Sequence, residues 1–291
     1  MHALAHSPPE GLAPINEAVN GQPWRCTRCE HRALGERPLG CSLCGRANTF
    51  ARASDDGGAT ARSAVLSWSW AADASAELVA RAPSGVRGFD RVTGGGLARG
   101  VVTFLGGARG TGKSTLALNV ASGVAGAGLG PVLVAPLEQG REAARRMLDE
   151  QGSPPAGIAF SETPDVDELG AMVAELRPAL VVVDSWKMLR VGGRTARSNT
   201  LAERASVLAF QATARAHQCA VLGILHMQAS NPRAYAAGSA LLQLCDVLLR
   251  FDPLGEGRAR LLCDGKNRYG TALERSDFRR DDARLCEVTT C

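Results

Sequence analysis

One segment constrains the fold of this chain more than any other, because residues 107–114 read GARGTGKS and match the pattern GxxxxGK(S/T). The apolar run Val101–Leu105 precedes the segment, and helix-forming residues follow it. In such a strand–loop–helix setting the glycines let the backbone curl, so that its N–H groups point at phosphate oxygens. The following helix adds the positive end of its dipole. The pattern predicts a phosphate-binding loop in an α/β fold, and a chance glycine-rich turn is the alternative.

The loop predicts ATP and Mg²⁺ as ligands. Lys113 is expected to reach the β- and γ-phosphates, and the hydroxyl of Ser114 is expected to bind Mg²⁺. A second apolar run, Leu180–Val183, ends in Asp184, whose carboxylate would hold the water shell of the same ion. The nucleotide-binding residues predicted around the loop are Gly107, Ala108, Arg109, Gly110, Thr111, Gly112, Lys113, Ser114 and Thr115.

Two further polar residues follow apolar runs that are expected to be strands. Glu138 comes after Val132–Ala135, where a carboxylate could orient and deprotonate the attacking water. Its alternative role is to cap the helix that starts near Arg141. His226 closes the run Val221–Leu225, at the sheet edge where α/β proteins bind ligands, and could sense the γ-phosphate. An ordinary strand-end histidine is the alternative.

A late motif places two cations one residue apart. Lys266 and Arg268 follow the short predicted strand Ala259–Cys263 and stand beside a glycine turn at Gly270. Together they could reach a phosphate group, and we count them with Lys113 and Glu138 as candidate catalytic residues. The alternative is a solvated, charged turn.

From Pro83 onward, apolar runs of four to six residues alternate with segments of helical length. Valine-rich runs bounded by Gly, Pro or Asp are typical of strands buried on both faces of a mostly parallel sheet. Aromatic residues make up only 4% of the chain, which favours this fold class over an aromatic-rich sandwich. The remaining predicted strand is Val247–Phe251, and the predicted helices are Lys113–Ala127, Arg141–Gln151, Val166–Leu176 and Thr200–His217.

Four of the nine cysteines form two CxxC pairs near the N-terminus. Two such loops can supply a closed tetrahedral Cys₄ site for Zn²⁺, with a structural role. A segment of this size has too small a hydrophobic core to fold without a cross-link such as a bound metal ion. A redox pair or a chance spacing is the alternative. The predicted zinc ligands are Cys26, Cys29, Cys41 and Cys44, whereas Cys219, Cys245 and Cys263 lie in strand-like runs and are expected to be buried.

Taken together, these motifs resemble the RadA/Sms family of DNA repair ATPases. The stretch Gly88–Leu97, GFDRVTGGGL, is similar to the family's LDRVLGGG segment, and KNRYG at 266–270 is similar to its KNRxG motif. The cysteine module, the phosphate loop and the Asp184 and His226 strand ends occur in the family's order. The resemblance covers roughly residues 22–290.

The resemblance implies a RecA-like core that assembles into a homo-oligomeric ring, usually a hexamer, around single-stranded or branched DNA. It implies ATP-driven branch migration in homologous recombination and repair. It also implies that Glu138 is the catalytic glutamate, and that Lys266 and Arg268 reach the γ-phosphate bound to the neighbouring subunit.

Three departures from the family pattern stand out. The family's acidic GEES stretch reads Leu137–Gly140, LEQG, and its GHVTK motif reads Leu225–Ala229, LHMQA, without the lysine. The chain ends at Cys291, so the resemblance implies a shortened relative that lacks the Lon-protease-like C-terminal domain.

Two segments are candidates for loops that contact DNA, with plain surface loops as the alternative. Arg190–Arg204 follows the Asp184 strand and is rich in arginine, and Met227–Gly238 contains Arg233 and Tyr235. A KaiC-like or replicative-helicase-like ATPase, or a regulatory ATP-binding assembly protein with little turnover, remains an alternative function. The zinc module favours the RadA/Sms type over the first two.

The remaining features limit the class of protein. No run of eighteen apolar residues exists, and the N-terminus lacks the apolar core of a secretion signal, so a cytoplasmic protein without membrane attachment is expected. A net charge of +4 permits nucleic-acid binding without demanding it. The predicted organisation is a disordered leader (1–20), a Cys₄ zinc module (21–52), a linker (53–82) and a RecA-like ATPase domain (83–291).

Overall fold

The structure is a computed structural model, and it divides the chain into two compact units, residues 1–77 and 78–291, which we describe separately. In the first unit, three short antiparallel strands form a sheet in the order β2-β1-β3: β1 (Trp24–Cys26), β2 (Arg32–Ala33) and β3 (Phe50–Arg52). The residues that the structure describes are 24–27, 32–33, 50–52, 79–152, 156–196, 200–228, 231, 234–270, 274–281 and 284–288.

Cys26 is buried in β1, whereas Cys29, Cys41 and Cys44 lie outside the described residues. The zinc site therefore stays a prediction. The same holds for the predicted leader and most of the predicted linker.

The described part of the second unit is built on one nine-stranded sheet, in the order β16-β15-β14-β13-β6-β12-β9-β7-β8. The six strands from β13 to β8 pair in parallel, and β14, β15 and β16 extend the sheet antiparallel. The strands are β6 (Val102–Gly107), β7 (Val132–Ala135), β8 (Ile158–Phe160), β9 (Leu180–Val183), β12 (Ala220–His226), β13 (Val247–Gly255), β14 (Arg258–Asn267), β15 (Arg275–Asp281) and β16 (Arg284–Glu287).

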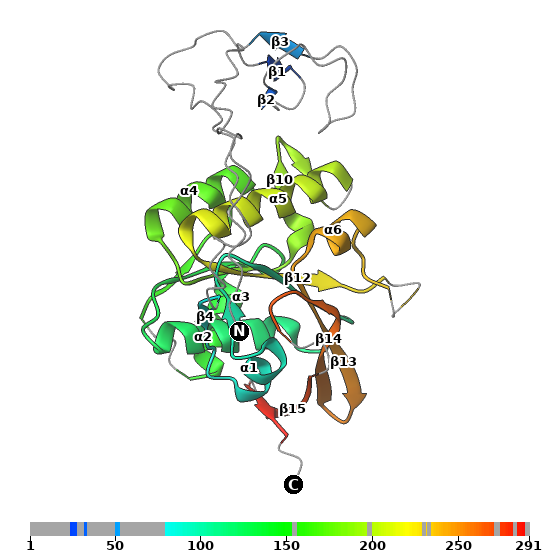
Figure 1. Cartoon of the computed structure of the whole chain (residues 1–291). Helices are drawn as coiled ribbons and strands as arrows, with labels where there is room; N and C mark the ends of the chain where they lie inside the picture. The colour runs from blue at the N-terminus through cyan, green and yellow to red at the C-terminus, as the bar shows by residue number, and fades with distance from the viewer. Residues whose placement is uncertain are drawn as a thin grey trace, which may run out of the picture. The chain divides into compact units, whose positions relative to one another are not determined.

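Helices cover both faces of this sheet (Figure 1). On one face α1 (Arg87–Thr93), α2 (Lys113–Gly126) and α3 (Arg141–Glu150) contribute to a core that includes Phe89, Leu116 and Leu148. On the other face α4 (Val166–Leu176) and α5 (Thr200–His217) contribute to a second core with Leu169 and Phe210. The smaller elements are α6 (Ser239–Leu244), the 3₁₀ turn η1 (Trp186–Met188) and the paired strands β4 (Arg81–Ala82) with β5 (Leu97–Ala98) and β10 (Arg190–Val191) with β11 (Arg194–Thr195).

The central strands are apolar because both of their faces are covered. Every residue of β7 and β9 is buried. In β12, Gly223 makes room for two rings, since a Cβ there would lie 2.6 Å from Trp186 and 2.7 Å from Phe104. Those rings pack edge to face with centroids 4.8 Å apart, which fixes the turn that follows β9.

The predicted mostly parallel α/β sheet is confirmed, and the four predicted helices are present within one residue of their predicted ends. The antiparallel extension β15–β16 is not predicted by the sequence pattern. These strands, RSDFRRD and RLCE, are dominated by charge, and their buried apolar side chains are Phe278 and Leu285. An edge strand with one apolar residue on its inner face leaves little periodic signal.

The three cysteines predicted to be buried, Cys219, Cys245 and Cys263, are buried. Burial raises the pKa of the Cys219 and Cys245 thiols to about 11, so both are inert at neutral pH. In the part of the chain that the structure describes, no helix is both long and apolar enough to cross a membrane.

Candidate functional site

The loop between β6 and α2 already has the shape that a phosphate chain requires. Gly110 and Gly112 adopt positive φ angles of 77° and 90°, which only glycine adopts readily. The Lys113 Nζ donates to the carbonyl oxygen of Ala108 at 2.7 Å, and Thr111 Oγ1 donates to the same oxygen at 2.9 Å. The ammonium group therefore closes the loop from inside, at the position where phosphate oxygens would replace the carbonyl as partners.

Burial lowers the pKa of Lys113 to about 8, although Asp184 and Glu138 partly oppose the shift. A phosphate group in the loop would favour the charged form. Affinity for a nucleotide should therefore be full below about pH 8 and should fall as the free ammonium loses its proton above that value.

This gives a testable expectation. Calorimetric titration with ADP from neutral pH to about pH 9 should show weakening affinity in the unaltered chain, whereas Lys113→Arg, which stays charged, should show a flat profile. A flat profile for the unaltered chain would contradict the lowered pKa.

Four neighbouring parallel strands end at the same edge of the sheet, and each delivers one candidate residue. Along the order β7-β9-β12-β6, these residues are Glu138, Asp184, His226 and the phosphate loop itself. The register pairs Ala135 with Val183 and His226 with Gly107, so β7 and β9 end at one level and β12 and β6 end together three residues further on. The structure thus brings together residues that are far apart in the sequence, as expected at the carboxyl edge of an α/β sheet.

Asp184 lies next to the start of α2. The Ser114 hydroxyl hydrogen-bonds the Asp184 carboxylate, and burial nevertheless raises the pKa of that carboxyl group. A hydroxyl and a carboxylate supply the oxygen ligands that Mg²⁺ prefers, with waters and phosphates completing its shell. The donor set therefore fits a nucleotide-bound Mg²⁺. Within the described residues there is no cluster of three or more His, Cys, Asp or Glu side chains, which a metal site made of protein ligands alone would need.

Glu138 and His226 face each other, with Oε2 and Nε2 2.7 Å apart. Partial burial tends to raise the pKa of Glu138, but hydrogen bonds from His226 and Ser185 outweigh it and lower the pKa. The carboxylate is therefore ionised at neutral pH, and 45% of its side chain is exposed to receive a water molecule.

The helix-capping alternative for Glu138 is wrong. The residue that caps α3 is Gly140, without a side-chain hydrogen bond, and the amide of Arg141 donates instead to Glu162 at 3.0 Å. The Glu138 side chain therefore does not cap α3.

A cleft of about 720 Å³ joins these strand ends to the loop that follows β12. Ser185 and Lys187, which the sequence analysis did not single out, also line it. Lys187 pairs with the buried Glu203 of α5 at 2.8 Å, and a lone lysine after a strand gives no signal in the sequence. The lining residues are Ala108, Arg109, Glu138, Ser185, Lys187, Met188, His226, Met227, Gln228 and Ala236.

Lys266 and Arg268 do not join this cleft. In β14, Lys266 pairs with Leu248, which is level with Phe104, whereas the phosphate loop begins after Gly107. Three residues of strand separate these levels, roughly 10 Å, and the two cations lie toward the amino ends of the parallel strands. Within one subunit, they therefore lie away from the phosphate loop, toward the opposite end of the parallel strands.

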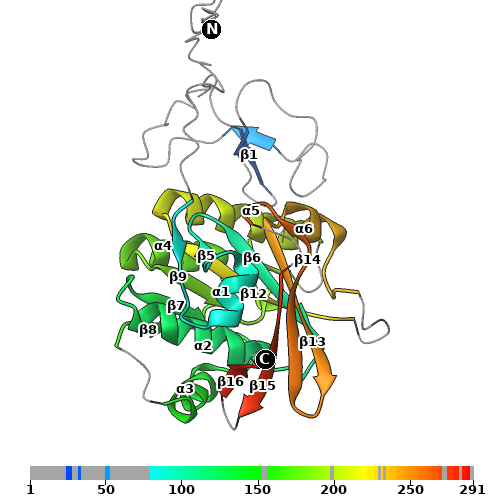
Figure 2. The ribbon, with the colours of Figure 1, turned by 60° about the horizontal axis from the view of Figure 1, so that its bottom comes forward.

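Neither cation is simply solvated. Arg268 Nη1 donates to Asp246 at 3.0 Å, and Lys266 Nζ donates to the carbonyl oxygens of Leu242, at 3.2 Å, and Gln243. Figure 2 shows α6, which carries these carbonyls, beside β14. Both cations thus have partners within their own subunit, although 53% of the Arg268 side chain is exposed to solvent.

The two candidate DNA loops are partly described. Arg190 and Arg194 belong to the hairpin β10–β11, and Arg197 and Arg233 lie outside the described residues. Tyr235 requires a correction, because it is buried rather than displayed on a loop. Its hydroxyl donates to Asp264 at 2.5 Å, and its ring fills the space beside Gly106, where a Cβ would lie 2.1 Å from Tyr235 Cε1. Tyr235 anchors the loop to the P-loop strand and is not available to stack on a base.

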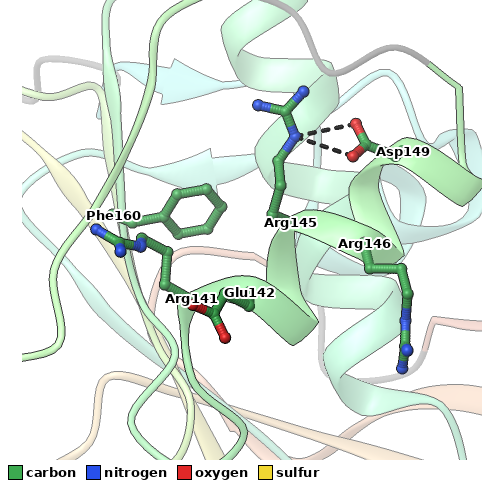
Figure 3. A pocket seen from close by; sticks show the side chains of 6 residues that line it. All are labelled: Arg141, Glu142, Arg145, Arg146, Asp149 and Phe160. Carbon is green, nitrogen blue, oxygen red and sulfur yellow. Dashed lines mark hydrogen bonds and ion pairs between the residues drawn. The ribbon is translucent and has the colours of Figure 1, made fainter.

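A second hollow of about 440 Å³ lies between α3 and β8 (Figure 3) and shares no residue with the cleft. Two of its charged side chains pair with each other, since Arg145 donates to Asp149 at 2.9 Å across one turn of α3. We assign it no role. Its lining residues are Arg141, Glu142, Arg145, Arg146, Asp149 and Phe160.

Comparison with known families and sequences identifies relatives. Residues 75–231 match the family model described as an AAA domain. The chain is 32% identical over 259 residues to the DNA repair protein RadA of Mycobacterium tuberculosis (strain CDC 1551 / Oshkosh), covering 86% of this chain and 53% of that protein. The protein of the same name from Mycolicibacterium smegmatis is 30% identical over 271 residues, covering 89% and 58%. The chain thus spans about half the length of the curated relatives it matches.

Two solved structures share the fold. The RadB recombinase superposes with a TM-score of 0.55 at 24% identity, and the KaiC-like protein PH0186 from Pyrococcus horikoshii OT3 with 0.59 at 17%. Each comparison covers 72% of this chain and all of the other. At these identities the likeness concerns the fold alone, and it supports the predicted RecA-like core.

Proposed function

Because the chain belongs to the AAA domain family, we propose that it is an ATP hydrolase and, more specifically, a DNA-binding motor of the RadA/Sms type. We place its action in homologous recombination and DNA repair, as ATP-driven branch migration. The observation that carries this proposal is the convergence of the phosphate loop, Asp184 and the Glu138–His226 pair at one edge of the sheet. Similarity to RadA proteins over 86% of the chain supports the more specific assignment.

In this proposal each of these residues has one task. Lys113 and the loop amides bind the β- and γ-phosphates, and Ser114 and Asp184 hold the nucleotide's Mg²⁺, which neutralises charge that develops on the phosphates. Glu138 accepts the proton of the attacking water. His226 orients Glu138 through the contact at 2.7 Å, which is a more specific task than sensing the γ-phosphate directly.

Lys266 and Arg268 act on the nucleotide of a neighbouring subunit. Their distance from the phosphate loop of their own subunit supports a role in trans, in which they supply cations to the neighbouring site as an arginine finger does. The proposal therefore includes a homo-oligomer, with a ring as the arrangement in which every site gains a neighbour.

A Cys₄ zinc module at residues 21–52, a linker at 53–82 and an ATPase domain at 83–291 belong to the same proposal, as does work in the cytoplasm without membrane attachment. The paired CxxC spacing supports the zinc site, and the arginines of the β10–β11 hairpin support contact with DNA phosphates.

The KaiC-like and helicase-like alternatives share this fold, so the fold does not separate them from the proposal. A regulatory protein with little turnover differs in its response to DNA. Single-stranded DNA is expected to raise the ATP turnover rate of the motor several-fold, because a strand that binds the loops bordering the cleft would favour the arrangement of the cleft that hydrolyses ATP. Turnover is measured with and without DNA, and Lys113→Ala is the control for contaminating ATPase. A rate that is low and indifferent to DNA would favour the regulatory protein.

Zinc content provides a separate test. Purified protein is expected to contain about one zinc ion per chain by metal analysis. Replacing Cys26 and Cys44 with serine should remove it, because each change takes one thiolate from a different CxxC loop. As a control, Cys286→Ser changes an exposed cysteine outside the module and should leave the zinc content unaltered. Unchanged zinc in the double variant would reject the Cys₄ site.

A further inference from the structure

The carboxylate of Asp246 is buried, and it does not line the cleft. It follows α6, directly before β13, and only 1% of its side chain is exposed. Within the described residues its side-chain carboxylate accepts three hydrogen bonds: from Val102 N at 3.4 Å, from Gln211 Nε2 at 3.2 Å and from Arg268 Nη1 at 3.0 Å. The donors belong to the start of the P-loop strand, to α5 and to the turn after β14. Asp246 is thus fixed to the core on one side and to Arg268 on the other.

The two side chains of the Asp246–Arg268 ion pair differ in their exposure to solvent. The carboxylate is buried, whereas 53% of the Arg268 side chain is exposed. Arginine carries five N–H donors in a rigid plane, so one bond to a fixed carboxylate sets the direction of the others. The contact at 3.0 Å uses Nη1 and leaves the exposed part of the guanidinium group able to meet an anion from outside the subunit.

The same segment also holds the second cation. Lys266 Nζ donates to the carbonyl oxygens of Leu242 and Gln243 in the last turn of α6. These carbonyls carry the negative end of the helix, which suits an ammonium group. Residues 242–246 therefore contact both Lys266 and Arg268.

We infer that Asp246 is a positioning residue, which aims Arg268 at the nucleotide bound to the adjacent subunit. The inference rests on the proposed role of Arg268 in trans. The competing view is that the ion pair only fastens β14 to the core, in which case a charge at position 246 is sufficient and its placement is unimportant.

Two substitutions separate these views. Asp246→Asn can keep accepting from Val102 and Gln211 through its oxygen, and it then presents its NH₂ group to Arg268 and releases it. Asp246→Glu keeps the charge but moves it by one methylene. Both variants are expected to bind ATP within about twofold of the unaltered chain and to lose turnover by about tenfold to a hundredfold, because a small misplacement of a catalytic group has effects of this size.

Mixing experiments identify which partner fails. Asp246→Asn subunits should recover activity with Lys113→Ala subunits, which bring an intact Arg268, and should not recover with Arg268→Ala subunits. Asp277→Asn is the matched control, since Asp277 pairs with Arg260 through two hydrogen bonds of 2.6 and 2.8 Å in the same sheet, away from both cations. It should leave turnover unchanged.

Several results overturn the inference. Full turnover in Asp246→Glu would mean that charge alone matters, and recovery with Arg268→Ala rather than with Lys113→Ala would mean that the variant damages its own cleft. Failure of both variants to fold, judged by thermal melting, would make Asp246 a requirement of the fold only. If Arg268→Ala and Lys113→Ala themselves do not complement each other, the proposed role in trans fails first, which distinguishes the two failures.

Discussion

An equimolar mixture of Arg268→Ala and Lys113→Ala subunits is expected to recover ATP turnover that neither variant has alone. The first variant keeps an intact phosphate loop and the second keeps an intact Arg268. If the site is shared between chains, a mixed ring contains some interfaces with both. Each variant alone should lose turnover on the order of a hundredfold or more. Arg268→Ala removes a cation supplied in trans, which stabilises charge that develops on the transferring phosphoryl group, and Lys113→Ala removes the cation that binds the phosphates in its own site.

The measurement is steady-state hydrolysis across mixing ratios, with mixed assembly verified by native mass spectrometry. Activity should peak at intermediate ratios. If no ratio recovers activity although mixed assemblies form, Arg268 acts within its own subunit and the ring-ATPase proposal fails in its present form.

A structural side effect has to be controlled, because Arg268→Ala leaves the buried Asp246 carboxylate without its cation. Loss of such a partner costs about 1–3 kcal/mol of folding free energy, at the lower end here because Arg268 is half exposed and water can replace it. Arg268→Lys keeps a cation beside Asp246 but lacks the planar fork. It should melt close to the unaltered chain and still lose most of its turnover.

Glu138→Gln is expected to lower ATP turnover by about 10²–10⁴-fold while leaving ATP affinity nearly intact. Glutamine keeps the size of the side chain and can still hydrogen-bond His226, but it cannot take a proton from water. Lys113→Ala should differ by weakening ATP binding as well, because it removes a cation from the phosphates in the ground state. Binding by calorimetry and single-turnover hydrolysis measure the two effects separately.

The matched control is Glu162→Gln, which makes the same chemical change in a nearby acid whose contact is with the amide of Arg141. Its turnover should be unaltered. Retention of full turnover by Glu138→Gln would show that another group handles the attacking water, with Asp184 as the first candidate.

Much of this protein could be predicted from local patterns. The phosphate loop is a contiguous motif whose glycines and lysine act within eight residues, and the valine-rich runs are buried on both faces, so each gives a strong signal in its own window. The charge-rich strands β15 and β16 were missed because they lie at the antiparallel edge of the sheet and bury few side chains.

The sequence by itself thus determined the phosphate loop, the parallel α/β class and the strand ends where polar residues occur, because these depend on neighbours along the chain. Only the tertiary structure decided which of those residues meet. The strand order β7-β9-β12-β6 brings Glu138 to His226 rather than to the start of α3, and the register of β14 carries Lys266 and Arg268 away from the phosphate loop. Tyr235 is buried beside Gly106, and Asp246 meets Arg268, for the same physical reason: strand order and register are set by the packing of the whole sheet, and spacing along the chain does not encode them.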